Sequence, residues 1–238
     1  MVGAALQEKS LRAVYLPELI SQENYSLTGE ILHHLVQVVR IEKDEELLLL
    51  NGEGLSVKTI VTEASKRNLT LKRISENFVE RSFQLDLALG IPKKDALDLC
   101  LKEAVELGFR KIYLIRGEFS QNKIPEAERL KNLLISALEQ SNSPYMPLIE
   151  EATWQTVSWN DYGTVLHLDS QRENKSSSGN ISRENLLVVG PEGGFSEKEL
   201  DLLRALPQGE SLHFPTPILR TPTAVAAGAG VVLQRLML

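Results

Sequence analysis

Residues 190–196, Gly-Pro-Glu-Gly-Gly-Phe-Ser, have the composition of a ligand-binding loop. They follow residues 186–189, an apolar run typical of a strand that is covered on both faces. Pro191 lacks a backbone donor and so ends the strand. Gly193 and Gly194 would let a ligand approach the main chain closely. This stretch is the first place in the chain where we expect chemistry.

The spacing of Ser196 and Glu199 is that of a capping box, which predicts that a helix begins directly after this loop. A strand end, a loop with few side chains and a helix N-terminus together are typical of an α/β ligand site. The loop is not a known phosphate fingerprint, because the spacings of a P-loop and of a dinucleotide loop are both absent. A tight strand-to-helix turn without a ligand remains the alternative.

A second stretch of similar character is residues 218–224, Ile-Leu-Arg-Thr-Pro-Thr-Ala. Thr221 can cap a helix, with Pro222 in the first helical position, where a missing N–H group costs nothing. We therefore expect a helix to begin at this point.

Composition bounds the class of protein. The chain has 238 residues, 42% of them hydrophobic, and a net charge of −6, which indicates a folded protein of one or two domains that buries a sizeable core. Dividing the chain at residue 80 leaves about −3 on each part. A nucleic-acid-binding protein with this net charge would have to bind its ligand through a local basic patch.

Several classes of protein are disfavoured. The first eight residues do not form a signal peptide, and the apolar run 224–233 has about half of the ~20 residues that span a bilayer. The single cysteine, Cys100, excludes an internal disulfide and a multi-cysteine metal site, and its predicted place is a buried helix face. His33 and His34 point to different sides of a predicted helix, which favours capping or packing over metal ligation. We expect a cytoplasmic protein without a metal and without a membrane segment.

The first part of the chain predicts a small β-barrel module. Strands are expected at 13–16, 47–50, 55–62 and 69–74, with a helix over 31–40 and a hairpin turn at 51–54. Polar residues at 75–77 and 80–82 predict a linker.

After the linker the pattern alternates between strands and helices. The expected strands are 83–89, 111–115, 165–169 and 186–189, the expected helices are 95–107 and 125–140, and 171–183 is a polar loop. This alternation indicates an α/β domain with a mostly parallel sheet. General topology rules predict an ordinary open sheet without a knot. We place the domains at residues 1–76 and 81–238.

Taken together, five segments of the chain resemble the RsmE family, the 16S rRNA uridine-N3 methyltransferases of the SPOUT superfamily. Besides 190–196 and 219–224, they are His-His-Leu-Val-Gln-Val-Val-Arg at 33–40, Ala-Val-Glu-Leu-Gly at 104–108 and Glu-Gln-Ser at 139–141. The matches are spread along nearly the whole chain in the order of the family.

The resemblance implies an architecture and an activity. Residues 1–76 would form a PUA-like β-barrel that binds RNA, and residues 81–238 would form a SPOUT-type parallel sheet with a C-terminal trefoil knot. The implied activity is the methylation, by S-adenosylmethionine (SAM), of N3 of a uridine in 16S rRNA. The implied partners are 16S rRNA or the assembled small ribosomal subunit, and a second copy of the chain.

The resemblance also implies a set of site residues. The SAM pocket would be made by loops that contain His167, Leu168, Gly190, Pro191, Glu192, Gly193, Gly194, Phe214, Ile218, Leu219, Thr221, Thr223 and Ala224. Because uridine N3 carries a proton that must be lost, a base or a cation is required beside the substrate. Glu192 and Arg220 are the catalytic candidates, and a structural salt bridge between them is the alternative. Arg40, Lys93 and Lys94 are candidates for RNA contact, although both lysines could merely solvate a loop.

The chain departs from the family pattern at several positions. Pro222 stands where the family has Glu, and Pro215 and Pro217 replace a Gly and an Arg. Ser143 stands where an Arg is usual, and Leu50 begins the turn that usually reads Phe-Asp-Gly. These departures leave two alternatives open: a SPOUT methyltransferase with another RNA substrate, or an RNA- or SAM-binding protein without catalysis.

The C-terminal helix predicts a homodimer. From Ala224 onward it is apolar nearly all round, which implies burial on several sides. One sheet could cover only one side of this helix, so a two-fold contact with a second copy would cover the rest. The resemblance adds that the active site would lie at this interface.

Overall fold

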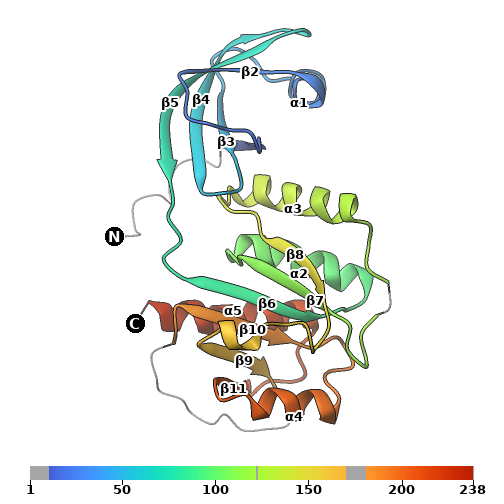
Figure 1. Cartoon of the computed structure of the whole chain (residues 1–238). Helices are drawn as coiled ribbons and strands as arrows, with labels where there is room; N and C mark the ends of the chain where they lie inside the picture. The colour runs from blue at the N-terminus through green and yellow to red at the C-terminus, as the bar shows by residue number, and fades with distance from the viewer. Residues whose placement is uncertain (1–10, 122, 170–180, 238) are drawn as a thin grey trace. The chain divides into compact units, whose positions relative to one another are not determined.

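The computed structural model describes residues 11–121, 123–169 and 181–237 of the 238 (Figure 1). The chain divides into two compact units. The first unit contains residues 1–80 and 135–145, and the second contains residues 81–134 and 146–238. The predicted domain boundaries stay a prediction, and most of the predicted loop 171–183 lies outside the described residues.

The first unit contains a five-stranded mixed sheet with the order β1-β3-β4-β5-β2. The strands are β1 (Arg12–Tyr15), β2 (Asn24–Leu27), β3 (Glu46–Leu50), β4 (Leu55–Ala64) and β5 (Leu69–Phe78). Strands β1 and β3 pair in parallel, and the other pairs are antiparallel. The predicted helix is present as α1 (Gly29–His33), which continues as a π-helical segment, η1 (His34–Val39).

The predicted hairpin between β3 and β4 is confirmed. Asn51 organises its turn, because its side-chain oxygen accepts hydrogen bonds from the N–H groups of Glu53 and Leu55, at 2.8 and 3.0 Å. The predicted polar linker at 75–77 is wrong. These residues continue β5 and pair with β4, since hydrogen bonding along a long hairpin outweighs their weak strand propensity.

The second unit is built on six parallel strands with the order β11-β9-β10-β6-β7-β8. They are β6 (Gln84–Gly90), β7 (Lys111–Ile115), β8 (Leu148–Ala152), β9 (Thr164–Leu168), β10 (Glu184–Val189) and β11 (Gly209–Leu212). Its helices are α2 (Lys94–Glu106), α4 (Glu197–Ala205), α5 (Thr221–Leu236) and the short 3-10 turn η2 (Trp159–Asp161). Helix α3 (Ala127–Ser141) begins in this unit and ends in the first. The predicted α/β class with a parallel sheet is confirmed, and the knot implied by the resemblance stays a prediction.

Strand β10 is covered on both faces, as its apolar run predicts. Leu186 and Val188 belong to a buried cluster that also contains Leu203 of α4. Leu187 points to the other face, where a Cβ atom on Gly228 of α5 would come within 2.7 Å of its Cδ1 atom. The small residue at 228 therefore lets α5 pack closely on the strand that leads into the 190–196 loop.

Helix α5 also packs against α2 (Figure 1). Its buried residues form one stripe, which consists of Thr221, Ala224, Val225, Gly228, Ala229 and Val232. The helix begins at Thr221 rather than after it, so the predicted cap at Thr221 is one residue late. Arg220 occupies the capping position with extended backbone angles. None of the helices in the described ranges is long and apolar enough to cross a membrane.

Two titratable side chains of α2 are affected by burial. Cys100 is fully buried, and burial raises the pKa of its thiol, so it is a structural residue as predicted. Burial also raises the pKa of the half-buried Glu103 carboxyl to about 7, with a smaller contribution from the Glu106 carboxylate. The folded state therefore holds the Glu103 proton more tightly than the unfolded chain, in which a Glu has a pKa of about 4.3.

This difference predicts a pH dependence of stability. Because the folded state binds more protons, the free energy of unfolding falls as pH rises from about 4.3 to about 7. Replacement of Glu103 by Gln removes this loss, so the variant should melt at a higher temperature than the parent protein at pH 8 and at a similar temperature at pH 4. Thermal unfolding at both pH values measures this. A difference of equal size at both would contradict the pKa assignment.

Candidate active site

Three segments of the second unit leave the carboxyl ends of neighbouring strands. Residues 190–196 follow β10, Asp169 follows β9, and residues 213–220 follow β11. Strand β9 lies between the other two, and His167 on it pairs in register with Val188 of β10 and Ser211 of β11. In open α/β sheets, ligands bind at this edge. The structure thus brings together the three predicted segments of the site.

The 190–196 loop is tightly folded on itself. Gly194 has a φ of +73° and donates its N–H to the carbonyl of Pro191 at 2.9 Å. A Cβ atom on Gly190 would come within 3.1 Å of the carbonyl carbon of Gly194. A Cβ atom on Gly90, at the end of β6, would come within 2.6 Å of Pro191. Glycine is therefore required here by contacts of the chain with itself.

The glycine at position 193 is explained by a contact within the chain, which the sequence did not indicate. A Cβ atom at this position would lie 2.9 Å from the Cβ atom of Phe119, in the segment that follows β7. A larger side chain would displace Phe119 whether or not a ligand is bound. The contact with Phe119, and not only the approach of a ligand, therefore requires a small residue at position 193.

Glu199 joins three segments through one buried carboxylate. The predicted capping box is present, and the N–H of Ser196 donates to the carboxylate at 2.8 Å. The other carboxylate oxygen accepts from the N–H of Glu118 at 2.9 Å and from the indole N–H of Trp154 at 2.7 Å. The segments after β7, β8 and β10 are thereby held together.

Aromatic contacts extend this junction. Trp154 stacks on Trp159, with ring centroids 5.8 Å apart and an angle of 11° between the planes. The ring of Phe195 in the 190–196 loop meets Trp154 edge to face, also at 5.8 Å. Such pairs stabilise by about 0.5–1.5 kcal/mol beyond the burial of their area. They fix the C-terminal end of the loop.

Glu192 fixes the middle of the loop to the segment after β6. Its carboxylate accepts a hydrogen bond from the backbone N–H of Lys93, at 3.1 and 3.3 Å from its two oxygens. The suggested salt bridge with Arg220 is not formed. Arg220 is exposed and makes no ion pair with any residue that the structure describes. Its guanidinium is available to a ligand.

The predicted residues around the start of α5 have distinct roles. Thr221 is buried, and its hydroxyl donates to the carbonyl of Gly190 at 3.4 Å, so it ties α5 to the loop. Ile218 is 91% exposed, which is unusual for a large apolar side chain at this edge of a sheet. Phe214 and Leu219 are half-buried, Ala224 is buried and Thr223 is exposed.

One ion pair that the sequence did not predict fixes the end of β9. The buried carboxylate of Asp169 accepts from Arg204 of α4 at 2.9 Å. Neither this pair nor the contacts of Glu118, Phe119 and Trp154 belongs to a sequence motif. In the sequence, only the closeness of the two tryptophans between β8 and β9 could have indicated these contacts, and it is a weak indication.

The candidates for RNA contact fall in both units. Arg40 is exposed in the first unit, at the end of η1, where it has a positive φ of 60°. Lys93 and Lys94 are exposed in the second unit, at the start of α2. The described residues contain no group of His, Cys, Asp or Glu that could hold a metal ion.

The chain is an α/β protein with a six-stranded parallel sheet, and two family models assign it to the RNA methyltransferases. Residues 79–233 match the family described as "RNA methyltransferase domain", and residues 27–72 match "RNA methyltransferase PUA domain".

Comparison with individual proteins narrows the family further. The ribosomal RNA small subunit methyltransferase E of Rickettsia conorii is 30% identical over 201 residues, which cover 81% of this chain and 82% of that protein. Its counterpart in Bacillus subtilis is 26% identical over 236 residues, covering 88% and 91%. The crystal structure of the Neisseria gonorrhoeae enzyme of this name, bound to SAM, superposes with a TM-score of 0.78 at 25% identity, covering 94% and 97%. This chain belongs to the ribosomal RNA small subunit methyltransferase E (RsmE) family.

The Glu199 junction leads to a prediction. In Glu199→Gln one of the two oxygens is replaced by an NH₂ donor, so the N–H groups of Ser196, Glu118 and Trp154 cannot all remain paired. The free energy of unfolding should fall by about 1–3 kcal/mol, the cost of a buried unsatisfied group. Exchange of the Ser196 and Glu118 amide protons should quicken at least about tenfold.

The matched control for this variant is Glu197→Gln, which changes an exposed carboxylate of the same helix. It should leave both amide protons protected. Equal exchange rates in the two variants would show that Glu199 does not hold the segments together.

Proposed function

We propose that this protein transfers a methyl group from SAM to N3 of a uridine in the 16S rRNA of the small ribosomal subunit. The observation that carries the proposal is the convergence of the 190–196 and 213–220 segments at one sheet edge, in a chain of the RsmE family. We infer the substrate, small-subunit rRNA, from the names of the relatives. We infer the cofactor from the SAM that is bound to the Neisseria enzyme. With this substrate, we expect the protein to act in the cytoplasm.

The residues present are suited to SAM. The loop 190–194 offers backbone groups with few side chains, and exposed Ile218 with half-buried Leu219 offers an apolar surface to a flat adenine ring. SAM supplies a methyl group on a positively charged sulfur, whose departure leaves a neutral thioether. The chain's own residues therefore need to act mainly on the uridine side of the reaction.

Loss of the N3 proton requires stabilisation of negative charge on the uracil ring. We assign this role to Arg220, because its guanidinium is exposed and lacks an ion pair among the described residues, and because the residue lies directly before α5. The N-terminal end of α5 adds a partial positive charge at the same place. Glu192 is already bonded to the Lys93 N–H, so we assign it to positioning of the loop. Its carboxylate still has lone pairs that can accept a further hydrogen bond.

A different RNA substrate is the second candidate. Pro215 and Pro217 lie in the exposed stretch 215–218, and Pro222 follows in the first turn of α5. All three are departures from the family pattern beside Arg220. They alter the side of the site that would meet RNA and leave the 190–194 loop unchanged.

The test is methylation of small ribosomal subunits or 16S rRNA by the purified protein, with the methyl group located by mass spectrometry. Arg220→Ala should lower kcat by roughly ten- to a thousandfold, the scale of the loss of one charge-stabilising group, with little change in SAM affinity. Arg220→Lys, which keeps the charge, should recover part of the activity. Methylation at a position other than uridine N3 would favour the second candidate. Loss of SAM binding in Arg220→Ala would make Arg220 structural.

We also infer that the protein forms a homodimer through α5. Outside its buried stripe this helix carries Ala227, Val231 and Leu233, which are only half-buried in the single chain. A Cβ atom on Gly230 would meet nothing within 4 Å. A second copy packed here would exclude water from this face and bring its own residues close to the site.

Gly230 gives a sharp test of the dimer. In the single chain Gly230→Leu meets no obstacle and replaces a poor helix former by a good one, so folding should be as stable or more stable by up to about 1 kcal/mol. At a close helix–helix contact the same side chain should separate the subunits. Light scattering should therefore give about twice 26.5 kDa for the parent protein and 26.5 kDa for the variant. A monomeric parent protein would refute the dimer.

A further inference from the structure

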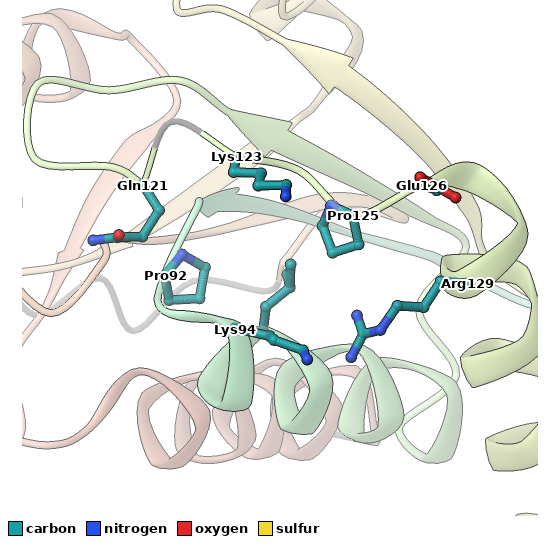
Figure 2. A pocket seen from close by; sticks show the side chains of 8 residues that line it. Pro92, Lys94, Gln121, Lys123, Pro125, Glu126 and Arg129 are labelled. Atoms are coloured by element: carbon teal, nitrogen blue, oxygen red, sulfur yellow. The ribbon is translucent and has the colours of Figure 1, made fainter.

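A pocket of about 380 Å³ lies beside the start of α2, and its walls come from two segments of the second unit (Figure 2). The apolar part of its lining includes Pro92, Leu97 and Pro125, and its cationic part consists of Lys94, Lys123 and Arg129. Figure 2 shows Lys123 and Arg129 extending toward the hollow, whereas the carboxylate of Glu126 points away from it. The volume falls in the range of about 300–1,000 Å³ that small-molecule sites occupy.

The pocket adjoins the 190–196 loop through the segment after β6. Glu192 of that loop accepts the N–H of Lys93, which lies between the pocket residues Pro92 and Lys94. The carbonyl of Ile91 accepts the N–H of Gln121, a further lining residue, at 2.8 Å. The segment after β6 therefore connects the pocket with the 190–196 loop.

The three cations differ in their partners. Arg129 forms an ion pair with Asp98 of α2 at 2.5 Å, which holds its guanidinium in place. Lys94 and Lys123 are exposed, and neither forms an ion pair within the described ranges. In a chain of net charge −6, two such lysines facing one apolar-walled pocket are a local basic site.

We propose that this pocket holds a nucleotide of the RNA strand next to the methylated uridine. Lys94 and Lys123 bind its phosphate, and Pro92, Leu97 and Pro125 contact its base or sugar. Single-stranded RNA is recognised by splaying out bases against such surfaces, while cations follow the backbone. The proposal rests on the proposed function, and it adds a binding site outside the loops that would hold SAM and the target base.

The test compares two double variants of the full-length protein. Lys94→Ala/Lys123→Ala removes both pocket lysines. Lys102→Ala/Lys131→Ala removes two exposed lysines, one from α2 and one from α3, that do not line the pocket. Binding of a short single-stranded RNA is measured by fluorescence anisotropy over a range of salt concentrations, and SAM binding is measured by calorimetry.

The pocket variant should bind the RNA about ten- to a hundredfold more weakly, and its salt slope should be smaller by about 0.7, the value for one phosphate contact to a single strand. The control variant should bind like the parent protein. SAM affinity should be the same in all three. Equal weakening in both variants, or no weakening in the pocket variant, overturns the proposal.

Small probes test the apolar wall separately. Uridine 5′-monophosphate should bind the parent protein at least tenfold more tightly than inorganic phosphate, and the pocket variant should lose this binding. Equal affinity for both probes would show that the pocket binds only the phosphate group, and it would overturn the assignment of a nucleotide.

The failure of this proposal is distinguishable from that of the proposed function. If the parent protein methylates rRNA and the pocket variant does so with unchanged KM, only the pocket assignment is wrong. If the parent protein neither binds nor methylates RNA, the proposed function is wrong and the pocket assignment is wrong with it.

Discussion

The second unit depends on the hydrogen bonds of one buried carboxylate, that of Glu199. Removal of a carboxylate from water is costly unless hydrogen-bond donors replace the lost hydration. Here the N–H groups of Ser196, Glu118 and Trp154 supply them. Because the three donors come from different connections of the sheet, the same bonds that stabilise the charge also fix the connections relative to one another. The position of the 190–196 loop is therefore a property of the whole sheet edge.

Local signals in the sequence predicted the parts of this arrangement that are local in the chain. The capping box of Ser196 and Glu199 spans three residues, and the apolar run of β10 lies directly before it. The remaining partners of Glu199 are 45 and 81 residues away in the chain, so no spacing rule connects them. The same limit explains Gly193, whose neighbour Phe119 follows a different strand.

The elements that the sequence did not predict are short and poorly marked. Strands β2, β8 and β11 have four or five residues each, and β8 carries two adjacent glutamates. Such segments become strands because a neighbour offers hydrogen bonds, which is tertiary information. The polar end of β5 was mistaken for a linker for the same reason. Arg220 and Glu192 were paired by charge alone, and the structure instead gives Glu192 a backbone donor.

Both tryptophans of the chain, Trp154 and Trp159, belong to the Glu199 junction. The indole of Trp154 donates to the carboxylate, and the indole of Trp159 stacks on that of Trp154. All tryptophan fluorescence of the protein therefore comes from side chains beside the 190–196 loop. The molecule therefore carries a native optical probe of this one region. A change in emission at constant fold would report on the arrangement of the loop in real time, without any label.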